Sequence, residues 1–329
     1  FIKLGIFILF LALIGYHFIN LIYLFCLLKN LKIIRNNKIL LKGIKIPDDI
    51  TITSSLKESC TNQHMIVIAV PSQFVRSVLK EVKKFSFNDT TFVSVAKGIE
   101  KDSLLTVSGI IKDEIPKISD EQIGVLSGPS HAEEVARKIP TAVVAASLNP
   151  NTAVHIQSAF ITSYFRVYSS TDILGVEYGG ALKNVIAIGA GIIDGAKFGD
   201  NTKAAIMTRG IAEISRLGIF LGAKAETFSG LSGMGDLIVT CMSKHSRNRF
   251  VGEQIGSGLK LKDVLKKMQM VAEGVVTSKS VYQLSVKKKI ETPICTAVYQ
   301  ILFEEKDPVK ATYELMTRDM KSESHKSYL

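Results

Sequence analysis

Residues 65–85 read MIVIAVPSQFVRSVLKEVKKF, and this stretch decides the fold of the first half of the chain. Its first six residues are all apolar, and from Pro71 onward the apolar residues recur at helical spacing. A short, wholly apolar and β-branched run is typical of a strand that is buried on both faces of a sheet. Proline is favoured at the start of a helix. The stretch therefore predicts a buried strand that leads directly into a helix.

The same alternation continues to about residue 170. Further strands are predicted at 90–98, 122–130, 140–147 and 163–170, and HAEEVARK (131–138) and the stretches 102–114 and 150–161 have the composition of the helices between them. Strands that alternate with helices form βαβ units, which give a parallel sheet with helices on both faces. The first half is therefore expected to be a doubly wound α/β domain.

The pattern changes after Thr171, where stretches with helical spacing follow one another and no clear strand returns. The first long helix is predicted near 175–196, which is crowded with Gly and Ala. These residues allow the backbones of neighbouring helices to approach closely, although Gly lowers helix propensity. We expect a tightly packed central helix in an all-helical second domain. The predicted domains are residues 1–172 and 173–329.

The net charge of +11 comes mainly from one end of the chain. Residues 1–47 contain seven Lys or Arg and no Asp or Glu, so the rest carries 34 basic and 30 acidic residues, a net charge of +4. A nucleic-acid-binding surface would have aromatic residues between its basic runs, and this sequence has no such pattern. We therefore expect no nucleic-acid partner.

The four cysteines form no CxxC pair, and the six histidines are scattered. These spacings predict neither a disulfide framework nor a metal site. A protein of the reducing cytoplasm fits this cysteine usage.

Polar residues follow three of the predicted strands. In doubly wound sheets, ligands bind beyond the carboxyl ends of the strands. Ser72 stands at a predicted helix start, and Ser130 and Glu133 have the spacing of a helix capping box, so both features have a structural explanation. Lys97 stands between a buried strand and a glycine, where its charge serves equally well as a ligand contact or as a surface charge.

Seven motifs, taken in order, resemble those of bacterial NAD(P)-dependent glycerol-3-phosphate dehydrogenases. They are IAVPS (68–72), VAKGIE (95–100), GPSHAEEVA (128–136), EYGGALKNVIAIGAGI (177–192), GLSGMGDLIVTC (230–241), SRNR (246–249) and VAEGVVTSK (271–279). The resemblance covers about residues 38–323. It implies a Rossmann domain that binds NAD or NADP, followed by a helical domain similar to that of 6-phosphogluconate dehydrogenase.

The resemblance also implies an activity, which is the reversible reduction of dihydroxyacetone phosphate to sn-glycerol 3-phosphate for phospholipid synthesis. The partner is then a small phosphorylated three-carbon substrate, the protein is cytoplasmic, and a homodimer is a family-level expectation. Ketopantoate reductases, which are relatives with a similar architecture, are disfavoured by the KNV, GMGD and SRNR sequences.

Lys183 in GALKNV matches the general acid/base of that family. Reduction of a ketone by hydride produces an alkoxide that needs a proton, and a lysine with a lowered pKa can supply it. The neighbours Leu182 and Val185 indicate a helix that is buried nearly all round, where an unpaired lysine is costly. This predicted burial favours a functional role over a solvated side chain.

The remaining site residues are assigned through the same resemblance. A lysine next to Lys183 lowers its pKa and stabilises an oxyanion, and an arginine beside a hydroxyl and an amide suits a phosphate. The residues that match substrate contacts are Lys97, Gly128, Ser130, Asp236, Ser246, Arg247 and Asn248. The residues that match cofactor contacts are Lys97, Ala132, Arg247, Val271 and Glu273.

The start of the chain departs from the family pattern. A Rossmann domain requires G-x-G-x-x-G after its first strand, because the diphosphate binds to bare backbone at a helix N-terminus. The sequence contains no such run, and 29 of its first 34 residues are Phe, Ile, Leu, Tyr, Asn or Lys, whose codons are rich in A and T. Our hypothesis is that residues 1–35 are an out-of-frame translation of the original start.

A membrane anchor is the alternative, since more than 18 nearly uncharged residues open the chain and lysines flank them. We expect no membrane partner, because the segment replaces an essential loop instead of preceding it. Loss of that loop leaves two further alternatives open, which are a degenerate, inactive copy and a membrane-tethered protein that binds a phosphate ligand. The nucleotide sequence for residues 1–45 distinguishes the two origins.

Overall fold

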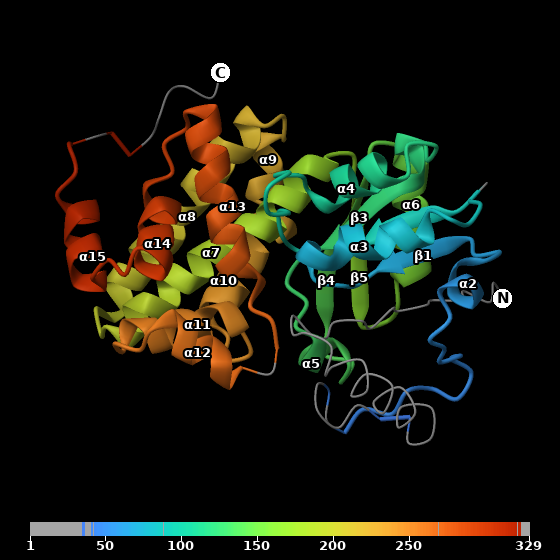
Figure 1. The fold of residues 1–329 in the computed structure, drawn as a ribbon, viewed down its shortest axis with the longest axis horizontal. Coiled ribbons are helices and arrows are strands. Elements are labelled where there is room, and N and C mark those ends of the chain that lie inside the picture. The colour runs from blue at the N-terminus through green and yellow to red at the C-terminus, as the bar shows by residue number, and fades with distance from the viewer. Residues whose placement is uncertain are drawn as a thin grey trace.

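The computed structural model describes residues 35, 36, 41, 43–87, 89–268, 270–320, 322 and 323. Both interpretations of residues 1–34 therefore lie outside the described residues. Figure 1 shows the described chain as two halves side by side, one built around a sheet and the other made of helices. The chain passes once from the first half to the second, after residue 170.

Five strands form one sheet in the order of the sequence. They are β1 (Met65–Ile68), β2 (Thr91–Ser94), β3 (Ile123–Ser127), β4 (Thr141–Ser147) and β5 (Phe165–Ser170). The first three strands run parallel to one another, and β4 and β5 run parallel to each other. All residues of β2 and β3 are buried, as expected of strands with a helical layer on each face. The five predicted strands are confirmed.

The β3–β4 pair is antiparallel, so the expectation of a wholly parallel sheet is wrong at this position. Parallel neighbours are joined by a crossover that usually contains a full helix packed on the sheet. Between β3 and β4 the chain forms only α5 (Ala132–Val135), a single turn. So short a helix cannot carry the chain back across the sheet, and β4 starts at the end where β3 finished.

Helices cover both faces of the sheet. On one face, α3 (Ser72–Val82) and α4 (Val107–Glu114) bury Val75, Leu79 and Ile110 in a common core with the strands. On the other face, α6 (Pro150–Phe160) buries Ile156. Two short elements, α2 (Leu56–Cys60) and η1 (Asp120–Gln122), complete this half. The doubly wound α/β architecture is confirmed.

The predicted helix at 102–114 begins five residues late, at Val107. Asp102 and Leu104 have positive φ angles of 71° and 62°, which are incompatible with a right-handed helix. The backbone N–H of Glu100 donates to the carbonyl of Leu105 and closes this turn. The turn holds the segment that follows β2 in place beside α3.

The second half is helical throughout its described residues, as predicted. Its elements are α7 (Ile173–Gly195), α8 (Gly199–Phe220), α9 (Ala225–Phe228), the π-helical turn η2 (Leu231–Gly235), α10 (Asp236–Met242), α11 (Arg247–Gly256), α12 (Leu261–Lys267), α13 (Glu273–Lys288), α14 (Pro293–Phe303) and α15 (Pro308–Met316). In Figure 1, α7 runs through the middle of this half and the other helices surround it.

Helix α7 is the central helix that the sequence predicted. From Tyr178 to Ile193 all of its side chains are buried. Among the described residues it is the one helix long and apolar enough to cross a membrane, and it lies entirely inside the molecule. A helix buried in this way belongs to the core of the bundle.

Glycines allow α7 and α11 to touch backbone to backbone. A Cβ added at Gly191 would overlap the carbonyl oxygen of Arg249, and one added at Gly252 would overlap the carbonyl oxygen of Ile188. Each helix therefore needs glycine at its side of the contact. This close contact fixes the N-terminus of α11 relative to the middle of α7.

Candidate functional site

Lys97 extends from the end of β2 toward the helical half. Its ammonium donates to the carbonyl oxygen of Gly128 at 2.8 Å and to Oδ2 of Asp236 at 2.6 Å. Its side chain is 18% exposed, which leaves one side open to solvent or to a ligand. The segment after the predicted strand therefore places the lysine at the boundary between the two halves.

Lys183 lies in the middle of α7 and reaches the same carboxylate. Its ammonium donates to Oδ1 of Asp236 at 2.9 Å and to the hydroxyl of Thr240 at 2.6 Å. Asp236 is the first residue of α10 and follows the π-helical turn η2. Irregular turns of this kind are frequent at functional sites. One buried carboxylate thus holds two ammonium groups that come from different halves of the molecule.

Burial and charge oppose each other at this triad. Burial lowers the pKa of Lys183 to about 8, the carboxylate of Asp236 works against this, and the ammonium of Lys97 adds to the lowering. Burial also disfavours the ionised form of Asp236, but the two ammonium groups outweigh it and hold the pKa of this carboxyl below its usual value. Lys183 is therefore able to gain and lose a proton near neutral pH.

Gly128 and Ser130 form the loop that follows β3. The carbonyl oxygen of Gly128 accepts from Lys97 and from the hydroxyl of Ser130, at 2.8 and 3.0 Å. Gly128 has a φ of +141°, and an added Cβ would lie 2.9 Å from the Cα of Val143, so glycine is required here. The predicted capping box is wrong, because α5 begins at Ala132 with no side-chain cap and Ser130 turns toward Gly128 instead.

Ser246, Arg247 and Asn248 lie at the start of α11. The hydroxyl of Ser246 caps the helix by accepting from the N–H of Arg249 at 3.2 Å. The guanidinium of Arg247 is exposed and donates to the carbonyl of Val271 at 2.9 Å. A helix N-terminus beside a guanidinium is a favourable place for a phosphate.

A chain of amide hydrogen bonds joins this helix start to Lys97. The N–H of Gly274 donates to Oδ1 of Asn248, whose side-chain amide donates to Oδ1 of Asn184, both at 2.9 Å. The side-chain amide of Asn184 in turn donates to the backbone oxygen of Lys97 at 3.0 Å. The two groups of predicted residues therefore belong to one connected site. One N–H of Asn248 is used in this chain, which leaves its second N–H for other partners.

Glu273 ties the start of α13 to the start of α3. Its partly buried carboxylate accepts from the N–H of Ser72 at 2.8 Å, and burial raises its pKa. Arg247 binds the neighbouring Val271, so three of the predicted cofactor residues lie together. Ala132 is exposed at the start of α5, and no hydrogen bond among the described residues joins it to that group.

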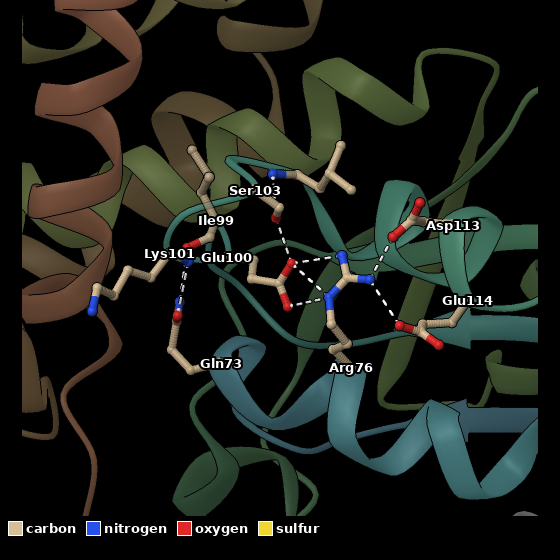
Figure 2. A network of polar contacts seen from close by, with 9 residues as sticks. Gln73, Arg76, Ile99, Glu100, Lys101, Ser103, Asp113 and Glu114 are labelled. Carbon is tan, nitrogen blue, oxygen red and sulfur yellow. Dashed lines mark hydrogen bonds and ion pairs between the residues drawn. The ribbon is translucent and has the colours of Figure 1, made fainter.

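A polar network behind the site fixes the segment that carries Lys97. Figure 2 shows Arg76 of α3 between three carboxylates. Its guanidinium donates to Glu100 at 2.8 to 3.0 Å, to Glu114 at 2.8 Å and to Asp113. Figure 2 also shows Gln73, which holds the backbone of residues 99 and 101 through both ends of its amide. The segment that carries Lys97 is therefore held in place by this network.

Two family models match the chain. Residues 25–153 match NAD-dependent glycerol-3-phosphate dehydrogenase N-terminus, and residues 172–313 match NAD-dependent glycerol-3-phosphate dehydrogenase C-terminus. The chain is 53% identical over 283 residues to the glycerol-3-phosphate dehydrogenase [NAD(P)+] of Chlorobium phaeobacteroides strain BS1, covering 86% of this chain and 85% of the relative. It is also 53% identical over 291 residues to the enzyme of the same name from Thermoanaerobacter sp. strain X514, covering 88% and 87%.

The chain belongs to the NAD(P)-dependent glycerol-3-phosphate dehydrogenase family. The crystal structure of glycerol-3-phosphate dehydrogenase from Coxiella burnetii superposes with a TM-score of 0.85 at 35% identity and covers 89% of each chain. A ketopantoate reductase from Ralstonia eutropha superposes with a TM-score of 0.52 at 8% identity, which reflects the fold alone. The resemblance and the fold class expected from the sequence are confirmed.

The polar groups around Lys97 suit the nicotinamide and substrate end of a glycerol-3-phosphate dehydrogenase site. The hydroxyls of Ser127 and Thr277 are buried and have no hydrogen-bond partner within the part of the chain that the structure describes. Ser127 and Lys97 both pack against Gly180, and Thr277 lies beside Gly98. Such orphaned hydroxyls are available to a polar ligand. For the diphosphate end, the sequence has no G-x-G-x-x-G run.

The sequence reasoning missed Thr240 and Asn184. Thr240 lies four residues after Asp236, and residues at this spacing share one face of a helix, so the spacing was an available signal. Asn184 directly follows Lys183, but the contact of its side chain with a backbone oxygen 87 residues away leaves no trace in the sequence.

Proposed function

We propose that this chain catalyses the NAD(P)-dependent interconversion of dihydroxyacetone phosphate and sn-glycerol 3-phosphate. The observation that carries this proposal is the array of Lys97, Asp236, Lys183 and Thr240, in which a nearly buried lysine with a pKa of about 8 lies beside the partly exposed Lys97. An acid with this pKa is suited to give a proton to a ketone oxygen and to take it back from an alcohol near neutral pH.

A nicotinamide cofactor bound at this site would supply the hydride to the carbonyl carbon in reduction and accept it back in oxidation. Lys183 donates its proton to the carbonyl oxygen as negative charge develops there, and Lys97 stabilises this charge. Asp236 holds both ammonium groups in position. Thr240 accepts from Lys183 and donates to the backbone oxygen of Asp236 at 2.6 Å, so it orients the proton donor.

The phosphate of the substrate binds at the start of α11. Arg247 provides charge there, Ser246 and Asn248 provide hydrogen bonds, and the helix N-terminus adds its partial positive charge. Gly128 and Ser130 border the three-carbon chain on the side of the sheet. Ala132, Arg247, Val271 and Glu273, with Lys97, contact the cofactor.

The remaining expectations belong to the same proposal. Residues 1–172 are the dinucleotide-binding domain and residues 173–329 the helical domain that completes the site. The protein acts in the cytoplasm in phospholipid synthesis, as a homodimer.

The test is oxidation of NADH and NADPH by the full chain with dihydroxyacetone phosphate, compared with Lys183→Met. A matched control is Lys203→Met, which removes another partly buried lysine, one that pairs with Asp194 at 2.8 Å outside the site. The proposal predicts that Lys183→Met loses about 1,000-fold or more in kcat while the control keeps its rate, since acid catalysis contributes roughly 10²- to 10⁴-fold.

No Lys183-dependent turnover, together with retained binding of sn-glycerol 3-phosphate, favours the inactive copy or the phosphate-binding protein. Equal turnover of ketopantoate in the same assay favours the ketopantoate reductase alternative.

A further inference from the structure

Two histidines face each other at the boundary between the two halves of the molecule. His131 precedes α5 on the side of the sheet, and His245 precedes Ser246 on the helical side. Their ring centroids are 6.0 Å apart, with 55° between the ring planes. They come from segments far apart in the sequence, and each adjoins a motif of the proposed substrate site.

His131 has an unfilled hydrogen-bonding position. Its Nε2 is buried and has no partner among the residues that the structure describes. Leaving a buried polar nitrogen unpaired is costly, so a group that binds at this place is expected to fill it. The loop of His131 is anchored, because Ser130 binds Gly128 and Gly128 binds Lys97. The backbone that carries His131 is therefore held in place.

Several charges surround His131. The charged groups are Glu133 and Glu134 of α5, Lys183 of α7 and Asp236 of α10. A further titratable group, His245, lies in the turn before α11. Burial lowers the pKa of His131, and the positive charge of Lys183 adds to the lowering. His131 is therefore neutral at pH 7 before an anion binds.

His245 is fixed on the opposite side. Its backbone N–H donates to the hydroxyl of Ser243 at 3.0 Å, which sets the turn that leads into α11. The next residue, Ser246, is the cap of the helix whose N-terminus is proposed to hold the phosphate. His245 therefore adjoins this helix start, and its ring lies next to that of His131.

We propose that His131 and His245 are phosphate-binding residues of this site, with Nε2 of His131 donating a hydrogen bond to a phosphate oxygen of the substrate. This proposal rests on the proposed function, because it assigns a further part of the same site. A dianionic phosphate beside His131 favours the imidazolium form. Substrate binding at pH 7 is therefore accompanied by uptake of a proton from the solvent onto His131, and the site prefers a phosphate dianion to a neutral triol.

The test is isothermal titration of the full chain at pH 7 with sn-glycerol 3-phosphate, in two buffers that differ in ionisation enthalpy. The difference in apparent enthalpy between the buffers gives the number of protons taken up. Inorganic phosphate serves as a second probe, and glycerol, which lacks the phosphate, serves as the control ligand. Wild type is expected to take up more protons than His131→Phe with both phosphate ligands, because the ionisation of the ligand itself is the same for the two proteins, and to show no measurable binding of glycerol.

Two variants of His131 separate its roles. His131→Phe keeps an aromatic ring but removes the donor, and it is expected to weaken binding of both phosphate ligands about 10- to 100-fold and to lose the part of the proton uptake that His131 contributes. His131→Gln keeps an N–H donor that does not titrate, so it is expected to restore most of the affinity but none of the proton uptake. His245→Phe is expected to weaken binding of both phosphate ligands.

Unchanged affinity and proton uptake in His131→Phe would overturn the proposal, as would failure of wild type to bind either phosphate ligand. Weakened binding of sn-glycerol 3-phosphate but not of inorganic phosphate would overturn it too, because His131 would then contact the glycerol part. Failure of the proposed function is recognised separately. Lys183-dependent turnover with an unaltered His131→Phe refutes only this inference, whereas absence of that turnover refutes the function.

Discussion

Asp236→Asn is the most informative single change, because it removes the carboxylate that Lys97 and Lys183 share while keeping the shape of the side chain. Breaking a buried ion pair usually costs about 3 to 5 kcal/mol, since one charge is left uncompensated. Lys183 has a way to avoid this cost, because its pKa of about 8 allows it to release its proton. The size of the loss therefore depends on pH.

The direction of this pH dependence follows from the number of protons that each protein binds in its folded and unfolded states. In wild type, Lys183 carries a proton below about pH 8 when folded and below 10.5 when unfolded. Loss of Asp236, which raises the pKa of Lys183, moves the folded value lower still. Between the two folded values the variant binds one proton fewer than wild type, so its relative stability falls by roughly 1.4 kcal/mol for each pH unit below 8. The contribution from Lys183 therefore grows as the pH falls from 8, until the folded pKa of Lys183 in the variant is reached.

The assay is urea unfolding of wild type and Asp236→Asn at pH 6, 7 and 8.5. Asp194→Asn is the matched control, because Asp194 also accepts from two cations, Lys203 and Arg249, at about one-fifth exposure. We expect the loss in Asp236→Asn to grow as the pH falls and the loss in the control to stay constant. A loss in Asp236→Asn that is the same at pH 6 and 8.5 would refute the assignment of a readily released proton to Lys183.

Three further changes test separate parts of the structure. Gly252→Ala is expected to destabilise the protein by about 1 to 3 kcal/mol in urea unfolding, because its Cβ would overlap the backbone of α7. The control is Gly109→Ala, whose Cβ would make ordinary contacts in α4 and which is expected to be neutral or stabilising by up to about 1 kcal/mol. Equal losses of stability in the two variants would contradict the backbone contact between α7 and α11. Thr240→Val is expected to lower kcat about 10-fold or more with little change in stability, whereas Thr240→Ser is expected to keep the wild-type rate. An unaltered kcat in Thr240→Val would argue against a role of Thr240 in orienting Lys183. Arg76→Met is expected to raise KM for dihydroxyacetone phosphate and to speed amide hydrogen exchange in residues 97–105, because it frees the segment that carries Lys97. Unchanged exchange in this segment would show that Arg76 does not position Lys97.

The sequence predicted the elements well because their signals are local. Short apolar runs such as 65–70 can be buried only as strands or helices, and their length and branching favour strands. The direction of β4 could not be predicted in this way, because it depends on whether the segment around α5 crosses the sheet. The late start of α4 could not be predicted for a similar reason, because the turn at Asp102 is closed by backbone hydrogen bonds.

The candidate site was predictable to the extent that its residues stand in recognisable motifs. Lys183 was also indicated by its apolar neighbours, and its burial in α7 agrees with that reading. Asn184 and His131 could not be found from the sequence, because their importance lies in contacts with segments that only folding brings near. The capping box failed because Ser130 has a competing acceptor in Gly128.

The central claim is that Lys183 gives and takes the proton at the substrate oxygen. The pH dependence of kcat/KM tests this most directly, because it reports the ionisation of groups before the substrate binds. With wild type, reduction of dihydroxyacetone phosphate is expected to fall above about pH 8, and oxidation of sn-glycerol 3-phosphate to rise until about pH 8. With Asp236→Asn, both limbs should move to lower pH. Profiles that do not change near pH 8, or that are the same in Lys183→Met as in wild type, would contradict the account.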